Sequence, residues 1–76
     1  MYVMKFSTRE GTYNNKHYHG KFVAIDYHSG GYPWGIGEEF SGRVSIFSTY
    51  EEARSYQETF KFLDIFELKI ELKEIT

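Results

Sequence analysis

A glycine-rich stretch holds the first residues of this chain that could do chemistry. HSGGYPWGIGEEF, residues 28–40, contains four of the seven glycines, the only proline and the only tryptophan. A phosphate cradle needs such glycines to open a helix whose N–H groups point at the anion. Here Glu38 and Glu39 follow at once, and no Gly-Lys-Ser/Thr is present. Two carboxylates repel phosphate, so the sequence argues against P-loop and Rossmann nucleotide binding.

Histidines supply the second candidate chemistry, a metal site. His17 and His19 are two residues apart, as are Asp26 and His28. Residues at this spacing share a face of a strand, and a hairpin that aligned both pairs could offer zinc two histidines and a carboxylate. The simpler interpretation is that these polar side chains decorate an exposed loop. We therefore expect no bound metal and no cofactor.

Acid/base and nucleophilic groups form the third candidate set. Glu38–Glu39 and Glu51–Glu52 are adjacent pairs, whose side chains diverge in a strand or a helix. No serine lies in a Gly-x-Ser-x-Gly context, and the absence of cysteine removes thiolate chemistry. The sequence thus predicts a protein without catalytic activity.

Strands must position most of these residues. Apolar patterning predicts them at Tyr2–Ser7, Lys21–Tyr27 and Arg43–Phe47. A fourth, Phe66–Lys73 (FELKIELK), alternates strictly between apolar and charged residues. Period two is typical of a half-buried strand, so this one should present four apolar residues to a helix. They are Phe66, Leu68, Ile70 and Leu72.

The helix lies before the last strand. Ser48-Thr49-Tyr50-Glu51 fits a capping box with Ser48 as the N-cap, and acidic residues in the first turn suit the helix dipole. The helix is expected from about Thr49 to about Phe60. The predicted order is β-β-β-α-β, an α+β fold in one domain (residues 1–76), with a mostly antiparallel sheet and the helix on one face. A strand order of 3-2-1-4, with the last strand parallel to the first, satisfies the crossover rule.

Size and composition bound the remaining properties. The chain has 76 residues, a net charge of −2 and 20% aromatic residues, which suit a small aromatic core. No apolar run approaches the roughly 18 residues that span a bilayer, and the start lacks a signal-peptide layout. We expect a soluble cytoplasmic protein that does not bind membranes, and leave a homodimer open because small domains often gain stability that way.

Charge and aromatics point to a partner surface. Residues 1–37 carry four basic and two acidic residues, whereas residues 38–76 carry five basic and nine acidic ones. Tyr32 and Trp34 flank Pro33 in a stretch read as a stiff loop, and such aromatics dominate protein interfaces. The alternative for Trp34 is a place in the core. Direct nucleic-acid binding through the basic half is disfavoured by the overall acidity.

The order of motifs resembles a class of very small proteins encoded by bacteriophages and prophages. The resemblance rests on Met-Tyr-Val at the start, an apolar strand ending in Asp26, Ser-Gly-Gly-Tyr-Pro (29–33), the helix entry 47–53 and the charged final strand. It implies a non-enzymatic inhibitor that occupies a host defence protein, of which anti-CRISPR proteins are the best-known kind. The runner-up is a small nucleic-acid-binding accessory protein. For the inhibitor, the expected partner-binding residues are Tyr32, Trp34, Glu38, Glu39, Glu51, Glu52 and Glu58.

Overall fold

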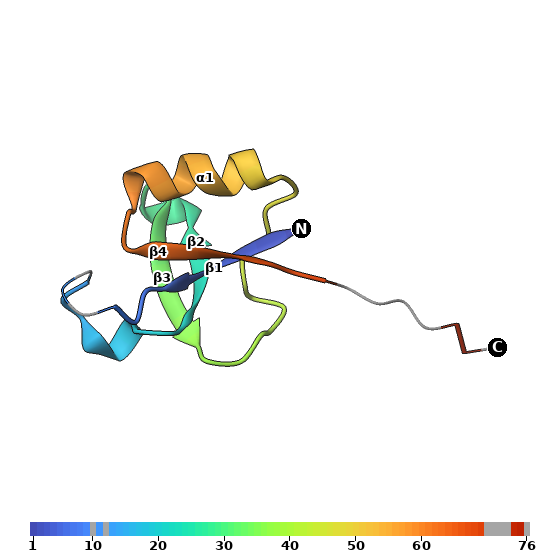
Figure 1. Cartoon of the computed structure of the whole chain (residues 1–76), viewed down its shortest axis with the longest axis horizontal. Coiled ribbons are helices and arrows are strands. Elements are labelled where there is room, and N and C mark those ends of the chain that lie inside the picture. Colours follow the sequence, from blue (N-terminus) through green and yellow to red (C-terminus); the bar gives the residue numbers. More distant parts are fainter. Residues whose placement is uncertain (10, 12, 70–73, 76) are drawn as a thin grey trace.

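The fold is a four-stranded antiparallel sheet with one helix packed against it (Figure 1). The structure, a computed structural model, describes residues 1–9, 11, 13–69 and 74–75. The strand order is β3-β2-β1-β4, so the predicted α+β class and the predicted order are confirmed. The elements are β1 (Tyr2–Phe6), η1 (Lys16–Tyr18), β2 (Phe22–Asp26), η2 (Tyr27–Ser29), β3 (Tyr32–Gly37), α1 (Tyr50–Thr59) and β4 (Leu63–Glu67), where η marks a 3-10 helix.

The third strand is not where the sequence placed it. Strand β3 is Tyr32–Gly37 (YPWGIG), a stretch predicted to be loop. Gly30 and Gly31, both at φ +83°, reverse the chain so tightly that Asp26 pairs with Tyr32 and Ile25 with Pro33. β3 lies at the edge of the sheet, where a proline is tolerated because no N–H is needed on the outer side.

The segment predicted as the third strand lies instead between β1 and β2, where these two strands diverge. β1 and β2 pair at Lys5 and Phe22 and then diverge. Ser45 bonds to β2, donating its N–H to Val23 O (3.0 Å) and accepting at Oγ from Ile25 N (2.8 Å). Phe47 bonds to β1 through an antiparallel bridge with Tyr2. Arg43–Phe47 is therefore not a regular strand, because it is joined to each neighbouring strand at one residue. Ser45 bonds to β2, and Phe47 bonds to β1.

This extra pass of the chain reverses the direction expected for the last strand. β4 is antiparallel to β1, with Val3 opposite Phe66 and Phe6 opposite Leu63, so the predicted parallel arrangement is wrong. The prediction assumed that the third strand led straight into the helix. Because residues 38–47 turn back across the sheet first, the helix and β4 follow with the opposite sense.

The register of β4 also differs from the prediction. The strand starts at Leu63, which is fully buried, and Ile65 lies on the same inner face. Phe66 therefore lies on the opposite face and is 45% exposed, so it does not face the helix. Leu68 follows the end of β4 and is half-buried. Ile70 and Leu72 lie outside the described residues. The cause is the tight turn after α1, where Leu63 N donates to Phe60 O (3.1 Å) and brings the chain into the sheet early.

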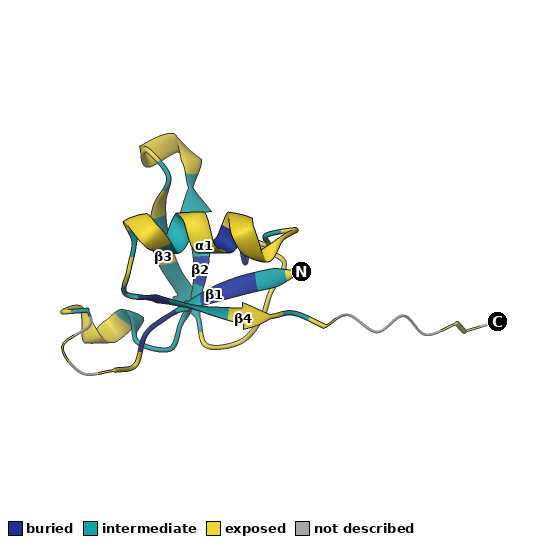
Figure 2. Cartoon of the chain, turned by 45° about the horizontal axis from the view of Figure 1, so that its top comes forward, coloured by how far each residue is buried: buried dark blue, intermediate teal, exposed yellow. Residues whose placement is uncertain are grey.

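Helix α1 matches its predicted span, with a shift of one residue in its cap. Thr49, not Ser48, is the N-cap, and its Oγ1 accepts a hydrogen bond from Glu52 N (3.2 Å). The helix covers the inner face of β1 and β4, where the buried residues gather (Figure 2). The core cluster is Met4, Phe6, Val23 and Leu63. Aromatic rings surround it, with Tyr13, Tyr18 and Phe62 all within 5.6 Å of the Phe6 ring centroid.

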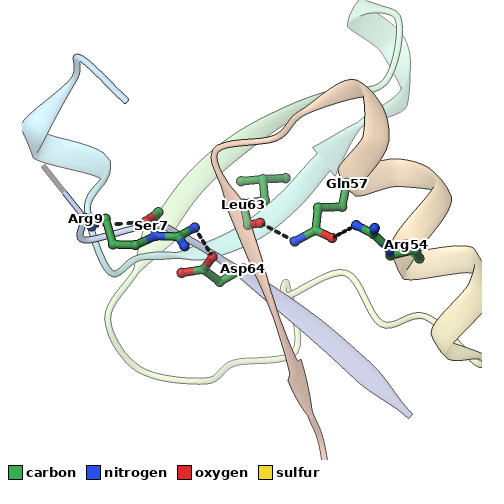
Figure 3. Close-up of polar contacts among 6 residues, drawn as sticks. All are labelled: Ser7, Arg9, Arg54, Gln57, Leu63 and Asp64. Carbon is green, nitrogen blue, oxygen red and sulfur yellow. Dashed lines mark hydrogen bonds and ion pairs between the residues drawn. The ribbon is translucent and has the colours of Figure 1, made fainter. Parts of the chain in front are cut away.

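Side chains from two other segments hold the start of β4 (Figure 3). Gln57 of α1 donates through Nε2 to Leu63 O (2.8 Å) and accepts at Oε1 from Arg54 Nη1 (2.8 Å). On the next residue, Asp64 pairs with Arg9 Nη2 at 2.9 Å. These contacts hold the first two residues of β4 in place, just after the turn that follows α1.

Candidate functional site

The candidate site is built on the edge strand β3. Tyr32 and Trp34 are two residues apart on this strand and therefore share a face. Tyr32 is 61% exposed and Trp34 is 49% exposed. Neither belongs to the core cluster, although Tyr32 makes an edge contact with Phe60 at 5.8 Å between ring centroids. Trp34 is thus a surface residue with half of its area open, and it sits on a paired strand rather than on the predicted loop.

A hollow of about 480 Å³ lies beside the tryptophan. Trp34, Ala24 and Ile36 supply apolar walls, and Asp26 and Arg43 add one charge of each sign. Ala24 is opposite Trp34 in the sheet, and its small side chain leaves room beside the indole ring. An open hollow with both apolar and charged walls, next to an exposed indole, can receive a side chain from a partner.

Asp26 has a structural role at this site. Its Oδ1 accepts hydrogen bonds from the backbone N–H groups of His28 (3.0 Å) and Ser29 (3.3 Å), which caps η2. Hydrogen bonding from the Ser29 side chain, together with these two N–H groups, lowers the pKa of the Asp26 carboxyl below its ordinary value. An ionised Asp26 therefore holds the turn that leads into β3.

The histidines considered as metal ligands are not assembled into a site. His17 is exposed on η1, and the His19 ring contacts Tyr13 O through Nε2 at 2.8 Å. Asp26 and His28 belong to the η2 turn described above. Across the part of the chain that the structure describes, no three His, Cys, Asp or Glu side chains are close enough together to hold a metal ion.

The acidic residues named from the sequence fall into two separate groups. Glu38 and Glu39 directly follow β3, in a segment that runs at the side of the sheet away from α1 in both views (Figures 1 and 2). Glu51, Glu52 and Glu58 lie on α1. All five are exposed. Only the first group adjoins Tyr32 and Trp34 through the chain, whereas Tyr32 contacts Phe60, the C-cap residue of the helix that carries the second group.

A cation-aromatic cluster on the outer face, opposite the helix, was missed by the sequence analysis. The Lys5 ammonium lies over the Phe22 ring at 4.5 Å from its centroid and over the Phe66 ring at 5.3 Å. Phe40 meets Phe22 edge-on at 5.9 Å. Lys5 of β1 stands opposite Phe22 of β2, and Trp34 of β3 stands opposite Ala24 of β2. Because Phe22 and Ala24 are two residues apart on β2, Lys5, Phe22 and Trp34 lie on the same face of the sheet. The available signal was Lys5 between Met4 and Phe6, which marks an outward position in β1.

Comparisons with known proteins add no relative to this picture. No protein-family model, curated protein or solved structure matches the chain. Among the residues described, no helix has the length and apolar character needed to cross a membrane.

Proposed function

We propose that this protein acts without catalysis, by binding another protein through the exposed aromatic face of β3. The observation that carries the proposal is the half-exposed Trp34 beside the more exposed Tyr32 on a paired strand. Tyrosines and phenylalanines pack around the core, while the only tryptophan stays at the surface next to an open hollow. Aromatic side chains on a rigid element lose little conformational entropy on docking, which favours binding.

The partner we propose is a host defence effector, a CRISPR–Cas component, which makes the protein a phage-type inhibitor. The resemblance to small phage proteins supports this choice, and so does the position of Glu38 and Glu39. These exposed carboxylates follow the aromatic strand directly. Carboxylates can substitute for phosphates in a Lys/Arg-lined nucleic-acid channel, and the attraction speeds encounter. Trp34 then supplies the desolvated contact that holds the complex.

The experiment is a binding and inhibition assay with purified CRISPR–Cas effector complexes. Trp34→Ala is compared with Tyr50→Ala, because Tyr50 is 48% exposed but lies on α1. We expect Trp34→Ala to weaken binding and inhibition at least tenfold, since interface hot spots contribute about 2 kcal/mol or more. Tyr50→Ala should behave like the parent protein. Equal effects of the two substitutions, with both variants folded, would contradict the proposal.

A second candidate is binding of single-stranded nucleic acid on the outer face. The observation that favours it is the mixture of cations and exposed rings there: Arg43 lines the hollow with Trp34, and Lys5 lies over Phe22 and Phe66. Bases stack on such rings while cations follow the phosphate backbone. Binding of a labelled oligonucleotide to the isolated protein at physiological salt, if Trp34→Ala abolishes it, would support this candidate over the inhibitor.

A further inference from the structure

The outer face of the sheet brings a carboxylate next to the two exposed rings of the candidate site. Asp26 of β2 pairs directly with Tyr32 of β3, and Trp34 stands opposite Ala24, two residues along β2 from Asp26. Residues two apart on a strand share a face, so Asp26 has one ring directly across from it and the other on the diagonal. Asp26 and Trp34 also line the same hollow. The site therefore combines aromatic rings with a negative charge.

The Asp26 carboxylate can accept more hydrogen bonds than the turn uses. Its Oδ1 accepts from the N–H groups of His28 and Ser29, and a carboxylate has about four lone-pair positions. Hydrogen bonding from the Ser29 side chain, followed by these N–H groups, lowers the pKa of Asp26 below its ordinary value. Asp26 is therefore a fixed negative charge at neutral pH, and it can still accept from a donor that enters the hollow.

Another part of the same face shows how this sheet holds a cation. The Lys5 ammonium lies 4.5 Å from the centroid of the Phe22 ring and 5.3 Å from that of Phe66. Both distances are within the roughly 6 Å over which a ring attracts a cation. Among the residues that the structure describes, no lysine or arginine lies in this way over Tyr32 or Trp34. Tryptophan attracts cations more strongly than phenylalanine does, so Trp34 can take a cation from another molecule.

The charges around the hollow favour a cation over an anion. The exposed carboxylates of Glu38 and Glu39 directly follow β3, and Asp26 adds a third negative charge. Of the residues that line the hollow, Arg43 alone is basic, and it is exposed. Within the described part of the chain, Arg43 forms no ion pair and lies over no ring. The hollow is thus not neutralised from within the chain.

We propose that the hollow beside Trp34 receives an arginine side chain of the partner protein, whose guanidinium stacks on the indole ring and donates to the Asp26 carboxylate. A guanidinium is planar, so it can lie flat on a ring and direct its N–H groups at a carboxylate, whereas the ammonium of lysine is a compact and more strongly hydrated charge. This inference deepens the proposed protein binding through β3 and rests on it, because a Lys/Arg-lined channel supplies such a residue. Arg43 limits the affinity, since it repels a second cation.

The test replaces the partner by short peptides of defined charge. Acetylated and amidated pentapeptides carry arginine, lysine, citrulline or glutamate between pairs of glycines, and citrulline has the shape of arginine without its charge. Trp34 is the only tryptophan of the chain, so its indole N–H gives a single signal in a proton–nitrogen NMR spectrum of the full chain. Each peptide is titrated at low salt while this signal is followed. Adenosine monophosphate is titrated as an anionic probe that carries an aromatic ring.

We expect the arginine peptide to shift the Trp34 signal saturably and to bind more tightly than the other probes. Its affinity should exceed that of the lysine peptide at least about threefold and that of the citrulline peptide at least about fivefold. The glutamate peptide and adenosine monophosphate should bind more weakly still. Added salt should weaken the arginine peptide, because the contact joins opposite charges at an exposed site.

Two variants change the charge of the hollow in opposite directions. Asp26→Asn keeps an oxygen that can accept from the turn, and it should weaken binding of the arginine peptide about threefold to fivefold. Arg43→Gln, at an exposed position, should strengthen binding about twofold or more, because a like charge is removed. The matched controls are Glu67→Gln and Lys61→Gln, exposed residues that do not line the hollow. Each repeats one of these changes in net charge and should leave the affinity unchanged.

Several outcomes would overturn the inference. They are equal affinities for the arginine and citrulline peptides, a Trp34 signal that no peptide shifts, and weaker binding of the arginine peptide to Arg43→Gln. Tighter binding of the glutamate peptide or of adenosine monophosphate, strengthened by Asp26→Asn, would assign an anion to the hollow instead. If Trp34→Ala abolishes binding to the effector while the arginine peptide leaves the Trp34 signal unmoved, this inference fails and the proposed function stands. Circular dichroism of every variant verifies the fold.

Discussion

Single residues explain why a glycine-rich stretch is a strand here and not an anion site. Gly35 lies on the inner side of β3, opposite Val23, and packs against the ring of Tyr18. A Cβ atom added at Gly35 would be 3.0 Å from Cγ and Cδ1 of Tyr18. Gly37 has nothing within 4 Å of its added Cβ. The first glycine is therefore required by close packing, and the second is not.

Gly35→Ala should destabilise the fold, while Gly37→Ala should not. The alanine at position 35 has to displace the Tyr18 ring close to its attachment point, and overpacking of this kind costs about 1–3 kcal/mol. Gly37 has no positive φ, so alanine there fits and should change the unfolding free energy by less than about 1 kcal/mol. Urea denaturation measures both values. Equal midpoints for the two variants would contradict the packing argument.

Tyr56 is expected to make the stability of the protein depend on pH in the alkaline range. Its hydroxyl donates to Gly31 O (2.7 Å), which joins α1 to the turn before β3. Burial, with a smaller contribution from Tyr27, raises the pKa of Tyr56 to about 12 from an ordinary value of 10. The protonated form is favoured in the folded state, so its contribution is complete below pH 10 and is lost as the pH rises toward 12.

The expected result is that Tyr56→Phe removes part of the loss of stability between pH 10 and pH 12. At neutral pH the same substitution should cost about 0.5–1.5 kcal/mol, because one hydrogen bond is lost. Thermal unfolding of the parent and the variant across this pH range measures the effect. Tyr50→Phe, at an exposed tyrosine on the same helix, is the control. Identical pH profiles for the parent and Tyr56→Phe would rule out this role.

At the scale of elements, the sequence predicted what local signals determine. β1, β2 and α1 were placed within about two residues, since apolar patterning and capping residues are local. β3 was missed because a proline and neighbouring glycines indicate a loop, whereas pairing with β2 makes the segment a strand. The register of β4 was missed because the tight turn at Phe60 starts the strand earlier than the alternating pattern does.

For the candidate site too, the sequence identified the residue types but not the positions that strand pairing gives them. The residue types Tyr32 and Trp34 were identified from the sequence, but their shared strand face follows only from the β2–β3 register. The acidic residues expected to bind a partner are all exposed, and their division between α1 and the segment after β3 depends on how the chain returns across the sheet. The Lys5 cluster requires contacts between three strands, which no local pattern encodes.

Alanine substitutions at Leu63 and Leu68 should show that Leu63, and not Leu68, is the core residue of this segment. Leu63 is fully buried and contacts the central cluster, so Leu63→Ala should cost about 2–5 kcal/mol. Leu68 is half-buried beyond the end of the strand, and Leu68→Ala should cost clearly less. Denaturant titration compares the unfolding free energies of the two variants. A larger loss for Leu68→Ala would favour the register first inferred from the alternating sequence.

At the scale of the whole molecule, the sheet has two faces and two edges. The inner face is covered by α1, the outer face carries exposed aromatic rings, and the two edges belong to β3 and β4. The acidic residues are likewise divided, with Glu38 and Glu39 beyond β3 and the others on α1. Which of the two acidic groups steers a partner can therefore be tested with variants of equal net charge.

Charge reversal beyond β3 should slow association with the proposed effector more than charge reversal on the helix. Glu38→Lys with Glu39→Lys replaces attraction by repulsion next to Trp34, where a Lys/Arg-lined channel would dock. Glu51→Lys with Glu58→Lys changes the net charge equally, but on α1. We expect the first variant to lower the association rate constant by about tenfold or more at low salt, with the difference shrinking as salt is added. Surface plasmon resonance over a salt series measures both.

The same Glu38→Lys, Glu39→Lys variant should strengthen any direct binding to oligonucleotides, because it removes two charges that repel phosphate. If it inhibits the effector as well as the parent does and the parent itself binds single-stranded DNA or RNA at physiological salt, the nucleic-acid function replaces the inhibitor.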